Sequence, residues 1–600
     1  MDKTSLLAII SGMEPADLRL YYPDGDQEGF WRKVRESPHY AEEVAEIRAE
    51  GERLRTQPVP ELTYALFSIF GRTGSRLEYE RVYFERRRML NTYVILALLE
   101  PAEEEPLERL QEILWVICNE YTWCLPAHLG ESGIAGTIDL FSAETGFALS
   151  EIHCLLGERL PPLLRLRIRQ EVGKRLFEPY LTGGPYFWET AEHNWSAVCA
   201  GSIGCAALLL ASEPSQLADI LLKAQRSLGY YLKGFGEDGA CLEGLGYWNY
   251  GFGYFVYYAD LADKRSRGRI SWFQEEKVRN IAKFQQTCFL GGGLVANFSD
   301  SQPVGQVYLG LSHYVAARFP EVEAPPVSLR AVYTEDHCSR WAPALRNLLW
   351  KDTAQAKTEW TMDSYYLPDA QWLLSRCRLG NSTFGFAAKG GHNDEPHNHN
   401  DLGQFIIAAD GNAYVSDLGS GEYTAGYFGA MRYSYDCNGS QGHSVPIIDG
   451  QFQTAGPEAY AVVLEASAGK EKDVLQLDLT QAYRYSGLER FTRSFEWHKE
   501  GPVSLTLSDE FSFKEAPGTL VERIVTLCPA VPGEGQVVLK GPDGQNLQII
   551  YDEGLLQPEI SEHTFSDHYG AKKTWYGVDF QAKACAESVR YTFEFQFSLS

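Results

Sequence analysis

The chain has 600 residues, of which 44% are hydrophobic and 22% are charged. This balance is typical of a globular protein with a sizeable core and excludes a disordered, collagenous or fibrous chain. Acidic residues outnumber basic ones, 80 to 54, and the resulting charge of −26 argues against nucleic-acid binding, which depends mainly on neutralising phosphates. The length exceeds that of one ordinary domain, so we expect a multidomain protein.

No apolar run approaches the about 18–20 residues that a membrane-spanning helix needs. The first residues, MDKTSLLAIISGMEPADL, match a secretory signal poorly, because they include Asp2 and only a short apolar run. The 12 cysteines are scattered without a CxxC pair, which is typical of free thiols in a reducing compartment. We therefore expect a cytoplasmic protein without a membrane partner, and a homo-oligomer stays open.

From the start to about residue 336 the pattern is helical. Apolar residues recur at helical spacing, for example over 107–118, 163–176 and 215–232. Clusters of Pro and Gly interrupt this pattern every ~30–50 residues, which indicates successive helical hairpins. We interpret the basic run at 86–88 as a solvated or salt-bridged helix face, with an anion site as the alternative.

A first polar stretch of the helical part is His193-Asn194-Trp195, which opens a helix after a Gly-Gly-Pro turn. A polar residue at a helix start is more often a cap than a catalyst. Trp195 fits either a packed core or a platform on which a sugar ring stacks.

A second polar stretch is EGLGYWNY, from Glu243 to Tyr250, followed by further tyrosines. The tyrosines fit an amphipathic helix core. The alternative is a loop that delivers Tyr247 and Tyr250 to acid–base chemistry, since a phenol can donate or accept a proton when its surroundings allow it.

After about residue 360 the pattern changes to strands, bounded by Gly, Asp, Pro and Ser. The β-rich runs lie at 385–389, 404–409, 413–417, 459–466, 474–479, 503–509 and 591–597. No helical crossovers separate these runs, so we expect antiparallel sheets. The pattern predicts a helical domain over 1–340 and a β-sheet domain over 341–600, joined within 327–358.

The most specific stretch is GHNDEPHNHNDLG at 391–403, just before a predicted strand. The side chains of His397 and His399 would project to one side of an extended segment. Asp417 ends a following strand, and His443 lies in GHSVPIIDG. Imidazoles with a carboxylate suit a divalent ion, with Zn²⁺ as the default. The alternative is a surface loop whose histidines only hydrogen-bond to one another.

Together these stretches resemble the heparinase II/III-like polysaccharide lyase superfamily. The likeness starts at WCLPAH (123–128) and IDLFSAETG (138–146), then runs in order through HNW, EGxxYxxY and HNHNDLGQFIIAADG. The resemblance implies an α+β multidomain fold, with an N-terminal incomplete (α/α) toroid of helical hairpins followed by C-terminal antiparallel β-sandwich sheets. It also implies β-elimination on uronic-acid-containing glycans, and so an acidic oligosaccharide as substrate.

The resemblance also implies roles for residues of the β-sheet part. His397 is similar to the active-site histidine of the family motif. His399, Asp417 and His443 are similar to the ligands of a largely structural zinc. Either Tyr433 or Tyr435 matches a further substrate-contacting tyrosine.

In the helical part, Tyr250 closes EGxxYxxY and is similar to the family's tyrosine proton carrier, with Tyr247 as its rival. Many relatives carry Asn-His before the Trp, whereas this chain has His193-Asn194. A neutral amide still donates to a uronate carboxyl, which leaves Tyr250 as base and acid. A cytoplasmic lyase would act on short imported oligosaccharides, so we expect exo-action.

Two other functions stay open on the sequence alone. One is a glycoside hydrolase on a helical toroid that uses paired carboxylates such as Asp238, Glu243 or Asp139, whose separation the sequence does not supply. The other is a non-catalytic glycan-binding homologue that keeps the fold without the base.

Overall fold

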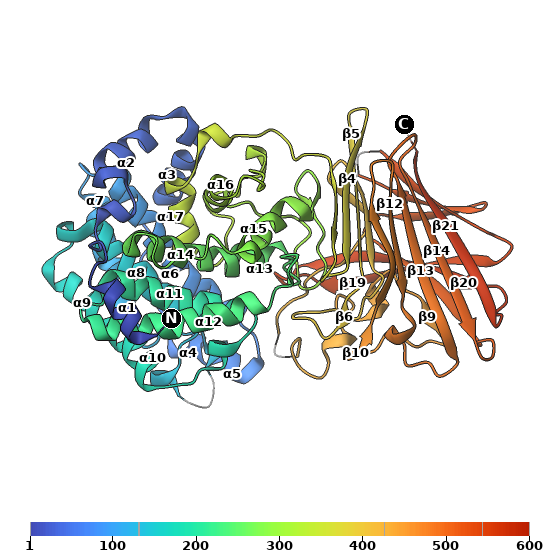
Figure 1. Ribbon diagram of the computed structural model, residues 1–600, viewed down its shortest axis with the longest axis horizontal. Coiled ribbons are helices and arrows are strands. Elements are labelled where there is room, and N and C mark those ends of the chain that lie inside the picture. Colours follow the sequence, from blue (N-terminus) through green and yellow to red (C-terminus); the bar gives the residue numbers. More distant parts are fainter. Residues whose placement is uncertain (1, 130–132, 425, 543, 599–600) are drawn as a thin grey trace. The chain divides into compact units, whose positions relative to one another are not determined.

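The computed structural model describes residues 2–129, 133–424, 426–542 and 544–598 (Figure 1). The chain forms two compact units. Unit 1 comprises Met1–Phe235, Asn249–Arg279 and Val307–Thr358. Unit 2 comprises Gly236–Trp248, Asn280–Gln306 and Glu359–Ser600. The division into a helical domain over 1–340 and a β-sheet domain over 341–600 stays a prediction.

Helices make up the greater part of unit 1. The α-helices of the chain are α1 (Lys3–Ile10), α2 (Gln27–Glu36), α3 (Ala41–Leu54), α4 (Tyr64–Phe67), α5 (Ile69–Thr73), α6 (Leu77–Leu99), α7 (Glu105–Cys118), α8 (Leu140–Leu156), α9 (Pro162–Val172), α10 (Glu178–Thr182), α11 (Asn194–Leu210), α12 (Pro214–Lys233), α13 (Leu245–Tyr247), α14 (Gly253–Ser266), α15 (Glu276–Cys288), α16 (Leu309–Arg318) and α17 (Trp341–Leu349). The π-helix η9 (Trp248–Phe252) precedes α14. None of the helices in the described part of the chain has the length and apolar character that crossing a membrane requires.

Helix α11 is the buried centre of unit 1. Its own residues are apolar or small on every side, and nearly all of them are buried, as in a helix that other elements cover all round. Helices α8, α12 and α14 pack against it. The small residues are needed for this packing, because a Cβ on Gly201 would lie 3.0 Å from the carbonyl oxygen of Tyr254, and one on Gly204 would lie 2.4 Å from the Tyr258 ring. The start of α11 is thereby held against the segment that carries Tyr250.

The basic run of α6 is buried rather than solvated. Arg86 Nη1 and Arg87 Nη1 lie 3.0 and 2.6 Å from Glu120 Oε1. Arg88 donates instead to backbone carbonyls, including that of Tyr333 at 2.7 Å. Arg88 Nε also lies 4.0 Å from Glu50 Oε1. The salt-bridged interpretation is thus correct, whereas a solvated face and an anion site are wrong, because protein groups already bind these guanidiniums.

Unit 2 is built from antiparallel sheets, as predicted. Its eight-stranded sheet has the order β11 (Val462–Ala468), β12 (Lys472–Asp478), β13 (Leu488–His498), β14 (Ser504–Phe513), β21 (Ser588–Ser598), β18 (Asn546–Tyr551), β17 (Gln536–Lys540), β16 (Ala530–Gly533). A four-stranded sheet has the order β19 (Leu556–Ser566), β20 (Lys572–Ala582), β15 (Leu520–Thr526), β9 (Ile447–Ile448). A five-stranded sheet has the order β3 (Ser364–Leu367), β4 (Trp372–Leu379), β5 (Ser382–Lys389), β7 (Phe405–Ala409), β8 (Asn412–Val415). Two short pairs, β1 (Phe289–Gly291) with β2 (Leu294–Val295) and β6 (His392–Asn393) with β10 (Gly456–Tyr460), complete the strands.

The large sheets share one apolar core. Alternate residues of β13 and β14 are buried, and Phe491 stacks on its register partner Phe511 with ring centroids 4.4 Å apart. Such cross-strand aromatic pairs stabilise a sheet and fix its register. All seven predicted β-rich runs overlap strands of unit 2. The expected fold class, a helical toroid followed by antiparallel β-sandwich sheets, is confirmed.

Candidate functional site

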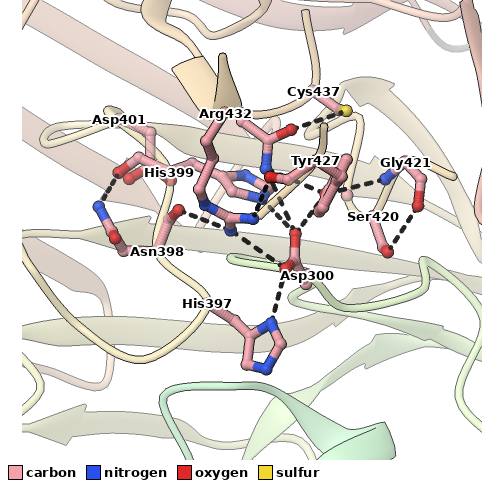
Figure 2. Close-up of polar contacts among 12 residues, drawn as sticks. Asp300, His397, Asn398, His399, Asp401, Ser420, Gly421, Tyr427, Arg432 and Cys437 are labelled. Atoms are coloured by element: carbon pink, nitrogen blue, oxygen red, sulfur yellow. Dashed lines mark hydrogen bonds and ion pairs between the residues drawn. The ribbon is translucent and has the colours of Figure 1, made fainter. Parts of the chain in front are cut away.

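A buried carboxylate, Asp300, is the centre of a polar cluster in unit 2 (Figure 2). His397 Nδ1 lies 2.7 Å from its Oδ2, and His399 Nε2 lies 3.0 Å from its Oδ1. Tyr427 donates to Oδ1 at 2.5 Å, and Arg432 donates to Oδ2 at 3.1 Å. Burial opposes ionisation of Asp300, but the hydrogen bonds from the two imidazoles outweigh it and hold the pKa of Asp300 well below its usual range.

His397 has carboxylates near both of its ring nitrogens. Its Nδ1 faces Asp300, and its Nε2 lies 3.4 Å from Glu243 Oε1. Burial would lower the pKa of His397, but the hydrogen bond to Asp300 and the charge of Glu243 raise it above its ordinary value. The side chain is 23% exposed, so this imidazole remains within reach of a ligand.

Tyr247 lies beside this imidazole within unit 2. The rings of Tyr247 and His397 stack with centroids 4.8 Å apart, and the Tyr247 hydroxyl lies 2.9 Å from that of Tyr423. Burial and the nearby charge of Glu243 raise the pKa of Tyr247, so its hydroxyl keeps its proton. Of the predicted site residues, the structure thus brings together Tyr247, Glu243 and His397.

The three predicted metal ligands meet in one buried group. Donor atoms of His399, Asp417 and His443 all lie within 4.8 Å of one another. The distance from His399 Nδ1 to His443 Nε2 is 3.3 Å, and Asp417 Oδ2 lies 3.6 Å from His443 Nε2. These side chains come from the loop before β7, the end of β8 and the loop before β9.

This group fits a metal ion by the chemistry of its donors. His399 Nε2 lies 3.0 Å from Asp300 Oδ1, and His443 Nδ1 lies 2.8 Å from the carbonyl oxygen of Gly439, so the other ring nitrogen of each histidine, with its lone pair in the neutral form, faces the other ring. Asp417 Oδ2 is buried and accepts no hydrogen bond from the described residues. Two lone pairs and a carboxylate oxygen that converge without a proton between them suit a cation, and the outer hydrogen bonds are those that orient metal-binding histidines.

A buried ion pair anchors the loop that carries His397 and His399 to β5. Lys389 Nζ lies 2.8 Å from Asp401 Oδ1, and both side chains are almost fully buried. The backbone of Asn400 donates to the carbonyl of Asn438 at 2.9 Å. His397 itself has φ of +55°, a backbone conformation that this anchored loop imposes.

The predicted tyrosines Tyr433 and Tyr435 lie at the edge of the same cluster. Tyr433 donates to Asn398 Oδ1 at 3.0 Å, and the Tyr435 hydroxyl lies 3.4 Å from Thr424 Oγ1. Neither contacts Asp300 or His397 directly through a hydrogen bond that the structure records; Arg432, their neighbour in the chain, reaches Asp300 instead.

Tyr250 belongs to a polar cluster within unit 1. Its hydroxyl donates to Glu144 Oε1, while Tyr254 donates to Glu144 Oε2 at 2.8 Å. The Arg340 guanidinium carbon lies 4.1 Å from the centre of the Tyr250 ring, and Arg340 Nε lies 3.7 Å from Glu144. Burial and the Glu144 charge raise the pKa of Tyr250 well above its ordinary value, while Arg340 lowers it.

Asn194 lies next to this cluster, within unit 1. A Cβ on Gly251, the residue after Tyr250, would lie 3.1 Å from the Asn194 Cβ. His193 is the N-cap of α11, and its Nδ1 accepts from the Trp195 backbone at 3.5 Å. His193 thus caps α11, and Asn194 is the first helical residue.

Trp195 is half-buried in an aromatic group of unit 1. Its ring centroid lies 5.0 Å from that of His128 and 5.0 Å from that of Phe187, which is 65% exposed. The ring is thus neither fully in the core nor isolated at the surface. His128 in turn contacts Asp139 through Nδ1 at 2.9 Å.

Glu144 gives the first testable prediction. Burial raises its pKa from 4.5 to about 7, although Arg340 and the hydroxyls of Tyr250 and Tyr254 favour the ionised form and Asp336 opposes it. The folded protein therefore binds this proton more tightly than the unfolded chain. Its contribution to stability is fully present below about pH 4.5 and is lost as the pH rises through about 7.

We expect Glu144→Gln, which stays neutral, to escape this loss. The loss is on the order of 3 kcal/mol, so the variant should gain stability relative to the wild type by about that amount between about pH 5 and about pH 8. Denaturant unfolding of both proteins at the two pH values checks this. A stability difference that does not change with pH would contradict the raised pKa.

Sequence reasoning did not find several of these residues. Asp300, in ANFSDSQP, and Glu144, in IDLFSAETG, have no local pattern that distinguishes them from ordinary acidic residues. Arg340 and Arg432 are likewise single basic residues in loops or at a helix start. The only signal was indirect, because Glu144 lies in a segment that carried the family resemblance.

Comparison with known proteins agrees with this fold. No protein-family model matches the chain, and no curated protein matches it in sequence. Among solved structures, a heparinase III is similar at a TM-score of 0.61 and 15% identity, over 98% of this chain and 93% of that one.

Two further solved structures are similar over nearly the whole chain. A mutant of the heparan sulfate lyase HepC from Pedobacter heparinus matches at a TM-score of 0.61 and 14% identity, over 97% of this chain and 92% of that one. The Streptomyces coelicolor chondroitin AC lyase in complex with chondroitin sulphate matches at a TM-score of 0.52 and 11% identity, over 96% of this chain and 83% of that one. The chain thus has the fold of these polysaccharide lyases.

Proposed function

We propose that the protein is a polysaccharide lyase that cleaves a uronic-acid-containing glycan by β-elimination, with Tyr250 as base and acid. The observation that carries this proposal is the Tyr250 hydroxyl bound to Glu144 beneath the Arg340 guanidinium. The similarity in fold to glycan lyases, over nearly the full length of the chain, supports the same reaction class.

Tyr250 is better placed than Tyr247 to lose a proton. A tyrosine base needs a group that takes its proton and a cation that stabilises the phenolate. Tyr250 has both, in Glu144 and Arg340. The Tyr247 hydroxyl instead contacts another hydroxyl, that of Tyr423, at 2.9 Å.

The proposed reaction is balanced in protons. Tyr250 passes its proton to Glu144, whose pKa of about 7 allows it to hold a proton near neutral pH. The phenolate then takes the C5 proton of the uronate, the C4–C5 double bond forms, and the C4–O bond breaks. Tyr250 returns that proton to the departing C4 oxygen, and Glu144 gives back the proton that it held. No water is consumed.

Charge that develops on the uronate carboxylate requires donors. We propose Asn194 as one, because it lies beside the segment of Tyr250 and its amide is neutral. For His397 of unit 2 we propose an imidazolium that neutralises a substrate carboxylate, since neighbouring carboxylates raise its pKa and it is partly exposed. Loss of one such preorganised donor typically costs ~3–4 kcal/mol of transition-state stabilisation.

We propose zinc as the ion of the group formed by His399, Asp417 and His443. When bound, zinc would supply charge and fixed bonds that tie the histidine loop to the β-sheets, which is a structural role. The chain's own residues carry out the proton transfers. The clustering of these three side chains and the buried Asp417 Oδ2, which accepts no hydrogen bond from the described residues, support a metal at this position.

A glycoside hydrolase is less well supported. Asp139 caps α8, where it accepts from the backbone of Ser142 at 2.7 Å and of Leu125 at 3.0 Å. Asp238 accepts from the backbone of Asp369 at 2.8 Å and of Ala370 at 3.0 Å. Two of the three candidate carboxylates thus hold local backbone structure.

We further propose that the protein acts in the cytoplasm, from the ends of short acidic oligosaccharides. Each of the 12 cysteines, all of which lie in the described residues, is a free thiol, and ten of them are buried. Free thiols are typical of a reducing compartment, where long extracellular glycans do not occur. The net charge of −26 also suits short acidic substrates, because these need no extended basic surface on the protein for binding.

An absorbance screen tests the proposed function. The purified protein is incubated with short heparosan, hyaluronan, chondroitin and alginate fragments, and ultraviolet absorbance is followed over time. A rising absorbance from the new conjugated double bond is expected with at least one fragment, and that fragment identifies the uronate. Cleavage without a rise in absorbance would contradict β-elimination.

A further inference from the structure

The two histidines of the 391–403 loop are joined through a residue from a distant part of the chain. Asp300 lies about a hundred positions before them, yet its two carboxylate oxygens divide between them: Oδ2 faces His397 Nδ1 and Oδ1 faces His399 Nε2 (Figure 2). Asp300 is buried, as are the ring of His399 and the contact itself.

The contacts with Asp300 determine which nitrogen of each imidazole carries a hydrogen. A carboxylate only accepts hydrogen bonds, so both facing nitrogens carry a proton. His399 therefore keeps the Nδ1 lone pair, which lies 3.3 Å from His443 Nε2 in the metal group. His397 is fixed with Nε2 on its far edge, 3.4 Å from Glu243 Oε1.

Other side chains hold Asp300 itself in this orientation. Tyr427 and Asn438 donate to Oδ1, at 2.5 and 3.4 Å, and Arg432 donates to Oδ2 at 3.1 Å. The carboxylate is consequently not free to rotate away from either imidazole. A single buried group thus orients both a candidate metal ligand and a candidate substrate-binding imidazole.

We infer that Asp300 is a positioning residue for two functions, orienting His399 for the metal and His397 for the substrate carboxylate. The second half of this inference rests on the proposed lyase function; the first half does not. Carboxylate partners of metal-binding histidines typically change metal affinity or activity by about 10–100-fold when they are replaced.

Asp300→Asn is the direct test, because an amide oxygen accepts from only one imidazole while its NH₂ group opposes the other N–H. Zinc affinity is measured by competition with a chromophoric chelator, and kcat and KM are measured on the fragment found by the absorbance screen. We expect zinc affinity to fall about 10–100-fold and kcat to fall by a similar factor with zinc saturating.

Two matched variants separate the halves of the inference. His397→Gln should lose activity but bind zinc as the wild type does, since it leaves the Asp300–His399 contact in place. Tyr427→Phe removes one hydrogen bond from Asp300 without altering its charge, and should change zinc affinity less than Asp300→Asn does. Wild-type zinc affinity in Asp300→Asn would overturn the role toward the metal, and wild-type kcat with zinc bound would overturn the role toward His397.

A measurement on the unaltered protein covers the case in which Asp300→Asn does not fold. Nitrogen NMR of histidine-labelled wild-type protein should show His399 protonated at Nε2 and His397 protonated at Nδ1. The opposite tautomer at His399 would overturn the inference. If the wild type cleaves no glycan but Asp300→Asn loses zinc, the proposed function fails while the positioning of His399 stands.

Discussion

Replacing Tyr250 with Phe is expected to lower turnover of a uronate oligosaccharide by about 10²–10⁴-fold, because it removes the group that takes and returns the C5 proton. The change deletes one oxygen from a half-buried ring whose packing stays intact. The fold should survive, since the main cost is one lost hydrogen bond to Glu144, about 1–3 kcal/mol. Initial rates and a far-ultraviolet circular dichroism spectrum check both statements.

Two matched tyrosine variants make this test specific. Tyr254→Phe removes the other hydroxyl on Glu144, at 2.8 Å, and should lower turnover far less than Tyr250→Phe does. Tyr247→Phe removes the hydroxyl that contacts Tyr423. If Tyr250→Phe stays fully active while Tyr247→Phe is inactive, the base is Tyr247 and the assignment of Glu144 and Arg340 fails with it.

Replacing Asp417 with Ala is expected to release the metal and to lower the melting temperature by about 5–15 °C, because metal-binding free energy contributes to folding. The substitution removes the carboxylate and leaves only the imidazoles of His399 and His443 as ligands. Two donors are too few for a closed structural metal site. Metal content by mass spectrometry and melting curves at one heating rate check the result.

A chelator supplies the control for this prediction. Stripping the wild type should lower its melting temperature toward that of Asp417→Ala, whereas the variant should not respond, since it has no ion to lose. Equal melting curves for the wild type and Asp417→Ala, each insensitive to chelator, would refute the structural metal.

Local patterns were sufficient to predict a helical part followed by antiparallel β-sheets, whereas the toroid was implied only by the family resemblance. The runs that became β12, β14 and β21 alternate or are continuously apolar over strand length, and the turns around them carry Gly, Asp and Pro. The helical half was predictable in the same way, because α7 and α12 have a clear apolar stripe. These signals depend only on neighbours in the chain.

The metal group was predictable because its ligands lie in recognisable contexts. His399, Asp417 and His443 stand in a histidine-rich loop, at the end of a strand and in a Gly-His-Ser turn, within 45 positions of one another. The antiparallel sheet then brings strand ends and loops together, which the family resemblance anticipated.

The groups that tune the site were not predictable, since only tertiary structure gives them meaning. Asp300 contacts histidines about a hundred residues away, and Glu144 contacts Tyr250 from 106 positions away. The arginines at 86–88 illustrate the same limit: the run predicted a solvated or salt-bridged helix face, but it did not predict that Glu120 and backbone carbonyls bind these side chains in the interior. A charged residue whose partner is distant in sequence leaves no local pattern.

In the proposed function, the protein breaks a glycosidic C–O bond by elimination, without water. The most direct test is mass spectrometry of the products formed from the uronate fragments in water enriched in heavy oxygen. Elimination predicts products that gain no heavy oxygen from bond cleavage, that sum to the mass of the substrate and that include one unsaturated sugar end. Products that take up heavy oxygen and together exceed the substrate by one water molecule would contradict it and establish hydrolysis.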